Sequence, residues 1–319
     1  MVYSILILIF TFSIYPINKS SKMFIRNPII LLIIFLSITA CGKQLHAHKA
    51  NVINDDTYEA SLLVQSDSIK CIDDGVNSNG EVNGSNMVGL DYYFNCEWKE
   101  GRRWHYTWED TTNSGFSELG NLFKQNGMRL SSISTAPSME DLKKLSVYII
   151  VDPDDTMDTP KPNYIDSVSI ENIVKWVGDG GFLMLLANDS ANCEFKHLNN
   201  LSEKFGIHFN QDCQNKVNGK NFEMGKFEEL PGHQIFAGVK KIYLKEISTL
   251  KLINQAEQVL KRGESTIMGF SKFGKGFVFA VGDPWIYNEY IDNRRLPKDF
   301  ENNTAAKNLV KWILGLSGK

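Results

Sequence analysis

The chain has 319 residues, with 34 Lys and Arg against 37 Asp and Glu, and its formal net charge at pH 7 is −3. A content of 43% hydrophobic and 22% charged residues is that of an ordinary globular protein, which excludes a disordered or low-complexity chain. Residues 1–40 contain basic residues but no acidic one, so the remainder is more acidic than the whole. Such a body lacks the basic face that non-specific nucleic-acid binding requires, and we expect no nucleic-acid partner.

The N-terminus has the pattern of an export signal. Residues 23–41 begin with the charged Arg26, continue with an apolar run at 29–36 and end in small residues, as secretory signals do. The last four, at 38–41, resemble a bacterial lipobox, in which Cys41 becomes the lipidated first residue. We therefore expect residues 1–40 to be a lipoprotein signal peptide, with Met1 or Met23 as the start, and an uncleaved membrane anchor as the alternative. The protein would be exported and lipid-anchored to a membrane, at the periplasmic face of the outer membrane or at the cell surface.

Mass spectrometry of the mature protein tests this prediction. We expect an N-terminal Cys41 that carries lipid, because cleavage before the cysteine and its acylation are coupled in lipoproteins. An unmodified, uncleaved N-terminus would contradict it.

Residues 41–86 form a polar N-terminal segment that ends in an Asn- and Gly-rich run, which indicates a flexible loop. Export to an oxidising compartment permits disulfides, and four cysteines besides Cys41 allow three pairings or free buried thiols. A zinc site built from Cys193, His197, His208 and Cys213 has loose spacing, so we expect no metal and no cofactor. The four cysteines are Cys71, Cys96, Cys193 and Cys213.

Residues 87–319 alternate between strand-like and helix-like runs. Apolar runs at 88–94, 130–133, 147–151 and 182–187 indicate strands, and a hairpin is expected at 266–281 around Gly274. Amphipathic patterns at 114–126, 167–177, 194–205 and 306–313 indicate helices. This alternation predicts an α/β domain with a mostly parallel, doubly wound sheet.

Ligands of such sheets bind beyond the carboxyl ends of the strands. Polar and aromatic residues gather at those positions in this sequence, although loops are polar in general. The candidates are Asn95 and residues 105–110 after the first strand, then Asp152, Asp154, Asp155, Asn188, Asp189, Asp283, Trp285, Tyr287, Asn288 and Glu289.

Several of these runs carry a family resemblance. They are GLDYYFN at 89–95, HYTWED at 105–110, VDPD at 151–154, AND at 187–189, NFEMG at 221–225 and GDPWIYNEY at 282–290. Together they resemble a bacterial module attached to unsaturated glucuronyl and rhamnogalacturonyl hydrolases, over roughly residues 88–316. The resemblance implies a three-layer sandwich of the flavodoxin-like or class I glutamine amidotransferase-like type. It does not carry over the amidotransferase nucleophile, because the expected elbow holds Asn188, Asp189 and Ser190, and Cys193 lies beyond it.

The resemblance also implies a substrate class, which is the acidic oligosaccharide on which those hydrolases act. Degradation of a pectin- or ulvan-like polysaccharide would then include a dehydratase that removes water from a saturated terminal uronic acid. That elimination needs a base, an acid and a neutraliser of the carboxylate. A non-catalytic module that binds acidic oligosaccharides, or a scaffold for a uronyl hydrolase, is the alternative.

Roles in the dehydratase hypothesis follow residue types. His105 and Tyr106 are the candidate base and acid, and Glu109 or Asp110 would orient the imidazole. The candidate substrate-binding residues are Asn188, Asp189, Asp283, Trp285, Arg294 and Arg295; the two arginines would clamp the carboxylate, and Trp285, Trp108 or Tyr287 would stack on a sugar ring. The structural alternative for His105 is a hydrogen-bonded packing residue, and for the arginines a solvated surface loop.

Overall fold

The structure is a computed structural model that describes residues 86–112 and 114–318. The described residues all belong to one compact unit of the chain. The signal peptide, Cys41 and Cys71 named above lie outside the described residues.

A nine-stranded sheet forms the centre of this unit. Its five parallel strands lie in the order β4 (Arg129–Ile133), β1 (Met87–Asp91), β5 (Val147–Val151), β6 (Phe182–Leu186) and β13 (Gly276–Val281). The antiparallel strands β12 (Ser265–Phe273), β10 (Leu250–Leu252) and β7 (Ile207–Phe209) continue it, and β11 (Glu257–Arg262) pairs with β12. The prediction of an α/β domain with a mostly parallel sheet is confirmed.

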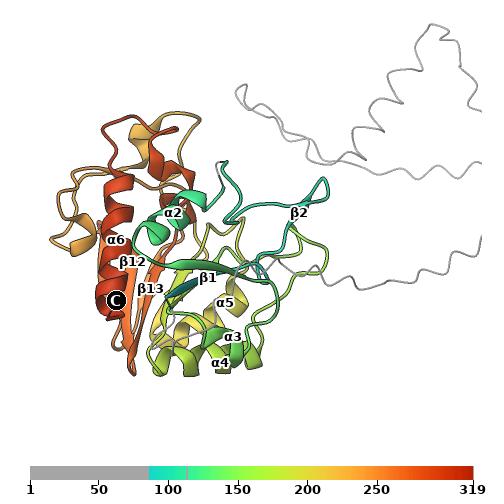
Figure 1. The fold of residues 1–319 in the computed structure, drawn as a ribbon. Helices are drawn as coiled ribbons and strands as arrows, with labels where there is room; N and C mark the ends of the chain where they lie inside the picture. Colours follow the sequence, from blue (N-terminus) through green and yellow to red (C-terminus); the bar gives the residue numbers. More distant parts are fainter. Residues whose placement is uncertain (1–85, 113, 319) are drawn as a thin grey trace, which may run out of the picture. The chain divides into compact units, whose positions relative to one another are not determined.

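Helices cover both faces of the sheet (Figure 1). Strand β5 shows why, because its side chains alternate between two cores: Val147, Ile149 and Val151 belong to one, and Tyr148 and Ile150 to the other. The first core includes side chains of α2 (Ser117–Gln125) and α6 (Asn302–Leu316); the second includes those of α3 (Met139–Leu142), α4 (Ser167–Gly178) and α5 (Phe195–Ser202). The unit is therefore a three-layer α/β sandwich.

Short elements fill the connections. Two small ribbons pair β2 (Trp98–Lys99) with β3 (Arg102–Arg103) and β8 (Lys226–Phe227) with β9 (Ile242–Tyr243). Single 3-10 turns are η1 (Glu203–Phe205), η2 (Phe222–Gly225), η3 (Gln234–Phe236), η4 (Pro284–Tyr287) and η5 (Glu289–Asp292).

The predicted strands and helices of the parallel part are found within a few residues of their expected bounds. The hairpin is confirmed as well, because Phe273 pairs with Gly276 across the turn at Gly274 and Lys275. The helix expected at 194–205 is divided, since a 3-10 turn follows α5 and Gly206 closes it with a φ of 79°. Strands β7, β10 and β11 were not predicted, because they are short or carry charged residues on an exposed face.

None of the helices described here is both long and apolar enough to cross a bilayer. Within the same residues, Cys96, Cys193 and Cys213 are free thiols. No disulfide joins these three.

Gly282, which follows β13, sits where no side chain fits. A Cβ there would lie 1.6 Å from the backbone oxygen of Ser248, whose own N–H donates to the Gly282 carbonyl at 3.0 Å. We expect Gly282→Ala to lower the free energy of unfolding by about 1–3 kcal/mol, the usual cost of overpacking.

Urea unfolding measures the effect, with Gly315→Ala as the matched control. Gly315 lies in α6 with open space at its Cβ position, so alanine there is expected to stabilise by about 0.5 kcal/mol. Equal stability of the two variants would contradict the close packing at Gly282.

Candidate functional site

The carboxyl ends of β1, β5, β6 and β13 bring four loops to one edge of the sheet. Asp91, at the end of β1, fixes the first loop by accepting hydrogen bonds from the Phe94 N–H at 2.8 Å and the Tyr148 hydroxyl at 2.7 Å. Asn95 joins this loop to the second, because its Nδ2 donates to the Asp152 carbonyl at 2.8 Å. The loops after β1 and β5 thus form one hydrogen-bonded unit.

Tyr106, Asp152 and Asn188 form a buried polar group at this edge. Asn188 Nδ2 donates to Asp152 Oδ2 at 3.1 Å and lies 3.4 Å from the Tyr106 hydroxyl. Burial raises the pKa of the Asp152 carboxyl well above its usual range, although hydrogen bonds to Asn188 and Tyr106 lower it. Burial and the neighbouring Asp152 also raise the pKa of Tyr106, which keeps its hydroxyl protonated. Oδ1 of Asp152 has no hydrogen-bond partner within the described residues.

His105 lies directly beside this group and forms a pair with Glu97. Its Nδ1 is 2.8 Å from Glu97 Oε1, and the imidazole is 31% exposed. The rings of His105 and Tyr106 are 5.6 Å apart. A carboxylate on Nδ1 leaves Nε2 as the nitrogen that a bound molecule can reach, which is the arrangement of a general base.

Three of the eight non-glycine residues with positive φ among the described residues lie at this site. His105 has a φ of 60°, Tyr106 of 40° and Asp152 of 44°. Each such conformation costs about 1 kcal/mol or more for a residue with a Cβ. Hydrogen bonds hold them in place: the Tyr106 N–H donates to the Ser114 carbonyl at 3.0 Å, and the Asp152 N–H to the Leu186 carbonyl at 2.8 Å. Part of the backbone strain of the described residues therefore falls on this polar group and on His105.

Asp154 extends the acidic character of the edge. Its Oδ2 accepts from the Cys96 N–H at 2.7 Å, while Oδ1 is buried without a partner among the described residues. Burial is the main cause that raises its pKa to about 7, and the neighbouring carboxylates of Glu97 and Asp158 contribute to this shift. Asp152 and Asp154 therefore both have raised pKa values, and both interact electrostatically with Glu97.

Two of the predicted residues contact other partners than expected. The carboxylate beside His105 is Glu97, whereas Glu109 accepts from the Tyr92 hydroxyl at 2.6 Å. Asp110 accepts from the N–H of Thr112 at 2.8 Å and caps its own turn. In the folded chain, neither Glu109 nor Asp110 orients the imidazole.

The predicted substrate-binding residues on the loops after β6 and β13 also have local roles. Asp189 accepts from the Ala191 N–H at 3.2 Å. Asp283 is fully buried and accepts from the N–H groups of Trp285 and Lys245, at 2.8 and 2.7 Å, while burial raises its pKa to about 7. Trp285 is half-buried, with the Lys245 ammonium 4.5 Å from its ring centre. Only Asn188 among these residues contacts the Tyr106–Asp152 group directly.

The two arginines differ in their availability. Arg294 is paired with Glu289 and Asp292, and Ser117 donates to Glu289 from the first turn of α2. Its charge is therefore already balanced, which does not suit a clamp on a substrate carboxylate. Arg295 is half-buried, and its Nε lacks a hydrogen-bond partner in the part of the chain that the structure describes.

One carboxylate cluster among the described residues has the spacing of a metal site, and it consists of Glu118, Glu289 and Asp292. Arg294 neutralises two of its three members. Within the same residues, the loose zinc pattern of Cys193, His197, His208 and Cys213 does not converge on such a cluster.

Glu97 and Cys193 belong to the site although the sequence did not indicate them, and Asp152 was a candidate by its position at a strand end but had no assigned role. Glu97 is eight residues from His105 in the sequence. The two side chains meet because the β2–β3 ribbon reverses the chain between them. Cys193 packs against Asp152, and burial raises the pKa of its thiol well above its usual range. A thiol in that environment is not a nucleophile.

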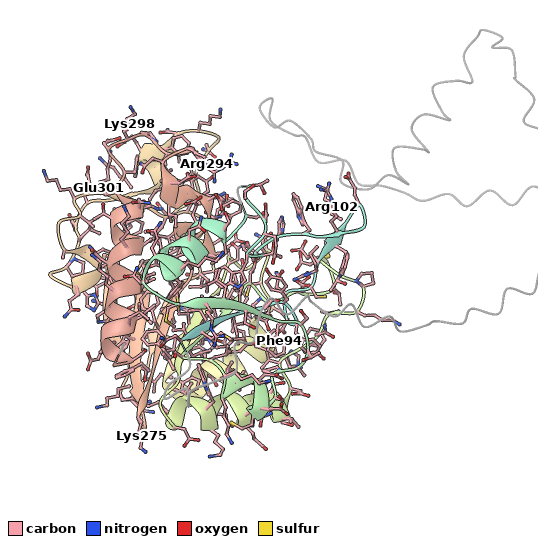
Figure 2. All side chains as sticks on the ribbon, viewed as in Figure 1. Phe94, Arg102, Lys275, Arg294, Lys298 and Glu301 are labelled. Carbon is pink, nitrogen blue, oxygen red and sulfur yellow. The ribbon has the colours of Figure 1, made fainter. Side chains whose placement is uncertain are left out.

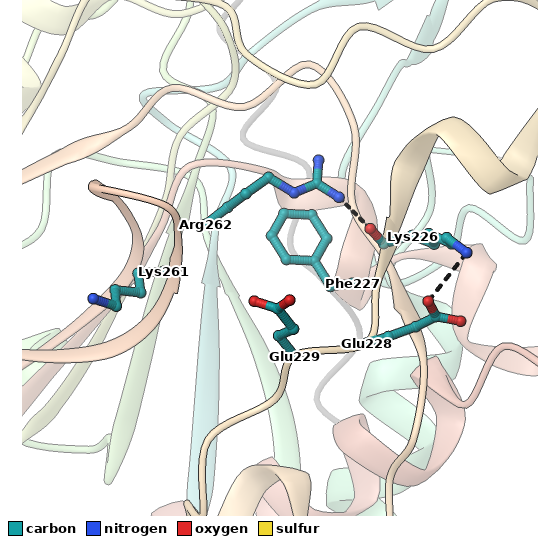
Figure 3. Close-up of a pocket in the computed structure, with 6 residues that line it drawn as sticks. All are labelled: Lys226, Phe227, Glu228, Glu229, Lys261 and Arg262. Atoms are coloured by element: carbon teal, nitrogen blue, oxygen red, sulfur yellow. Dashed lines mark hydrogen bonds and ion pairs between the residues drawn. The ribbon is translucent and has the colours of Figure 1, made fainter.

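A hollow lies apart from this site, against β8 and β11 (Figure 3). It has a volume of about 240 Å³, and Arg262 lies over the Phe227 ring at 4.0 Å and donates to the Lys226 carbonyl. None of the predicted site residues lines it; the lining residues are Lys226, Phe227, Glu228, Glu229, Lys261 and Arg262.

No protein-family model matches the chain, and no curated protein matches it. Among solved structures, the mmIFT52 N-terminal domain is similar with a TM-score of 0.55 at 16% identity, over 71% of this chain and 96% of that domain. A ThuA-like protein from Bacteroides uniformis ATCC 8492 aligns over 75% of this chain and 96% of its own, at 13% identity and a TM-score of 0.43. The exo-beta-1,4-mannosidase Op5Man5 from Opitutaceae bacterium strain TAV5 aligns over 71% of this chain but 35% of its own, at 14% identity and a TM-score of 0.42. The first of these likenesses shows a shared fold.

The buried carboxyls predict how stability depends on pH. Burial raises the pKa of Asp154 and of Asp283 from 3.8 to about 7, so the folded state retains protons that the unfolded chain has released. The free energy of unfolding is therefore expected to fall as the pH rises from about 4 to about 7. Urea unfolding across this range measures the slope.

The variant Asp154→Asn removes the contribution of one buried carboxyl to the pH dependence of the free energy of unfolding. Asparagine keeps an acceptor for the Cys96 N–H and cannot ionise, so we expect a shallower slope and a gain in relative stability above pH 7. Asp179→Asn, on the exposed end of α4, is the control and should retain the slope of the unaltered protein. An Asp154→Asn slope equal to that of the control would contradict the buried proton.

Proposed function

We propose that the protein is a dehydratase that removes water from a saturated uronic acid at the non-reducing end of an acidic oligosaccharide. The observation that carries the proposal is the His105–Glu97 pair, 2.8 Å apart, next to the buried Tyr106, Asp152 and Asn188. This arrangement puts a base and a proton source side by side at the carboxyl edge of the sheet, which is what an elimination needs.

The proposed reaction uses each group once. Nε2 of His105 takes the proton from C5, the carbon next to the sugar carboxylate, and the C–H electrons form the C4–C5 double bond. The C4–O bond breaks, and the leaving hydroxyl takes a proton to depart as water. Tyr106 supplies that proton, and Asp152 and Asn188 hold its hydroxyl in place. Arg295 is the remaining candidate to neutralise the substrate carboxylate.

The substrate class rests on the family resemblance of the motifs at 89–95, 105–110, 151–154 and 282–290. That resemblance also supports a glutamine amidotransferase-like version of the three-layer sandwich, and a functional link to unsaturated uronyl hydrolases, which would consume the product. The expected export as a lipoprotein, through Cys41, would place the reaction outside the cytoplasm. The amidotransferase reaction is not part of the proposal, because Cys193 is a buried, protonated thiol and Ser190 lies exposed in a loop.

The test uses oligosaccharides that end in saturated glucuronic or iduronic acid. Turnover is followed by the ultraviolet absorbance of the enol-uronate and by the loss of one water in the mass spectrum. We expect both signals with the unaltered protein. We expect His105→Ala and Glu97→Gln to lower kcat, by about 10²-fold or more for His105→Ala, because the base is lost.

The chain offers a matched control for these variants. His208 forms a similar pair with Glu203, at 2.7 Å, on β7. His208→Ala should therefore leave kcat unchanged.

Binding without turnover in the unaltered protein would replace the dehydratase by a carbohydrate-binding module, and the absence of both would leave a scaffold for a uronyl hydrolase.

A further inference from the structure

The ribbon of β2 and β3 lies apart from the helical layers (Figure 1). Its strands pair Trp98 with Arg103 and Lys99 with Arg102, and Glu100 and Gly101 turn between them in left-handed conformations, with φ of 52° and 76°. Figure 2 shows Arg102 at the outer end of this ribbon.

An exposed tryptophan and a local positive charge distinguish the ribbon from the rest of the protein. Trp98 is 63% exposed, and residues 97–103 contain three cations, Lys99, Arg102 and Arg103, and two acidic residues, Glu97 and Glu100. The chain as a whole has a net charge of −3, so this local excess of positive charge is not an average property of its surface.

Within residues 86–112 and 114–318, none of these cations forms an ion pair. Lys99 lies over the Trp104 ring, 4.4 Å from its centre. Arg103 donates to two backbone carbonyls, and Arg102 is exposed. Lys99 and Arg102 therefore keep an unbalanced charge that an anion can use.

Hydrogen bonds attach the β2–β3 ribbon to the candidate site. Arg103 donates to the carbonyls of Asn95 at 2.6 Å and Glu97 at 2.9 Å. Glu97, which immediately precedes Trp98, is the partner of His105. The rings of Trp104 and His105 are 4.6 Å apart. The position of the exposed tryptophan is thus tied to the position of the base.

We propose that the ribbon binds the sugar residues next to the reacting uronic acid, with Trp98 as a stacking platform and Lys99 and Arg102 as contacts for sulfate or carboxylate groups. The inference rests on the proposed function, which puts the chain end at His105. An aromatic face packs against the C–H groups of a sugar ring, and the cations of Lys99 and Arg102, on the adjacent rung of the ribbon, favour a polyanionic chain over a neutral one. The ribbon therefore determines both the length and the charge of the oligosaccharide that the protein selects.

The experiment compares a hexasaccharide of alternating uronate and sulfated sugar with its terminal disaccharide and with neutral cellohexaose, using the full chain. For Trp98→Ala we expect KM and Kd for the hexasaccharide to rise about tenfold, with kcat on the disaccharide unchanged. Trp98→Phe, which keeps an aromatic face, should recover most of the affinity. Val168→Ala, at a 61% exposed position on α4, is the control for the loss of a surface apolar group.

The charge is tested in the same way. Arg102→Ala should weaken binding of the hexasaccharide several-fold and reduce its salt dependence, whereas Arg129→Ala, an exposed arginine on the edge strand β4, should not. Cellohexaose should bind weakly to every variant.

The outcomes separate this inference from the proposed function. Turnover with an affinity that Trp98→Ala leaves unchanged, or cellohexaose bound as tightly as the anionic hexasaccharide, overturns the role of the ribbon. Affinity that depends on Trp98 and Arg102 in a protein without turnover supports the ribbon and overturns the dehydratase.

Discussion

The site depends on carboxylates that are buried at the carboxyl edge of a parallel sheet. Asp91, Asp152 and Asp283 each follow or end a central strand, and each is nearly fully removed from water. Burying a carboxyl is costly unless it is hydrogen-bonded or protonated, and both solutions occur. Asp91 and Asp283 receive backbone N–H groups and thereby fix the loops, and burial also raises their pKa values, to about 6 and about 7. Asp152 accepts a hydrogen bond from Asn188, and its other oxygen has no partner among the described residues.

The hydrogen-bond partners of each polar residue decide whether its side chain is available for chemistry. The side-chain oxygens of Asp189, Asp110 and Asp283 accept hydrogen bonds from nearby N–H groups, so these residues stabilise turns. Asp152 and His105 differ, since Asp152 contacts Asn188 from the next loop, His105 contacts Glu97 across the β2–β3 ribbon, and both lie in left-handed backbone conformations. Residues held in such conformations by their surroundings gather at functional sites in proteins.

The proposed dehydratase joins these features to the substrate suggested by the family resemblance. The fold itself does not decide the reaction, because a three-layer sandwich supports many activities, and the similarity to the mmIFT52 N-terminal domain concerns the fold. What favours acid–base chemistry is the contact between a half-exposed imidazole and Glu97, close to groups that keep their protons. The neighbouring ribbon adds an aromatic and cationic surface to a protein that is otherwise mildly acidic.

The parallel core could be predicted from sequence because its signals are local. Val147–Val151 and Phe182–Leu186 are continuous apolar runs, and strands buried on both faces have that pattern. The expectation that polar residues meet at the carboxyl edge follows from the same alternation, and Asp152 and Asn188 do meet there, 36 residues apart in the chain. The antiparallel strands were missed because β11 is charged on its exposed positions and β10 has three residues.

The sequence by itself determined the class of fold and the set of polar residues at the strand ends, because burial periodicity is encoded residue by residue. Only the tertiary structure decided which of those residues touch. The choice of Glu97 over Glu109 beside His105 depends on how the β2–β3 ribbon folds, and the contacts of Asp152 with Asn188 and Asn95 depend on how separate loops pack against one another. Loop packing is set by hydrogen bonds between distant backbone groups, and no local pattern in the chain records them.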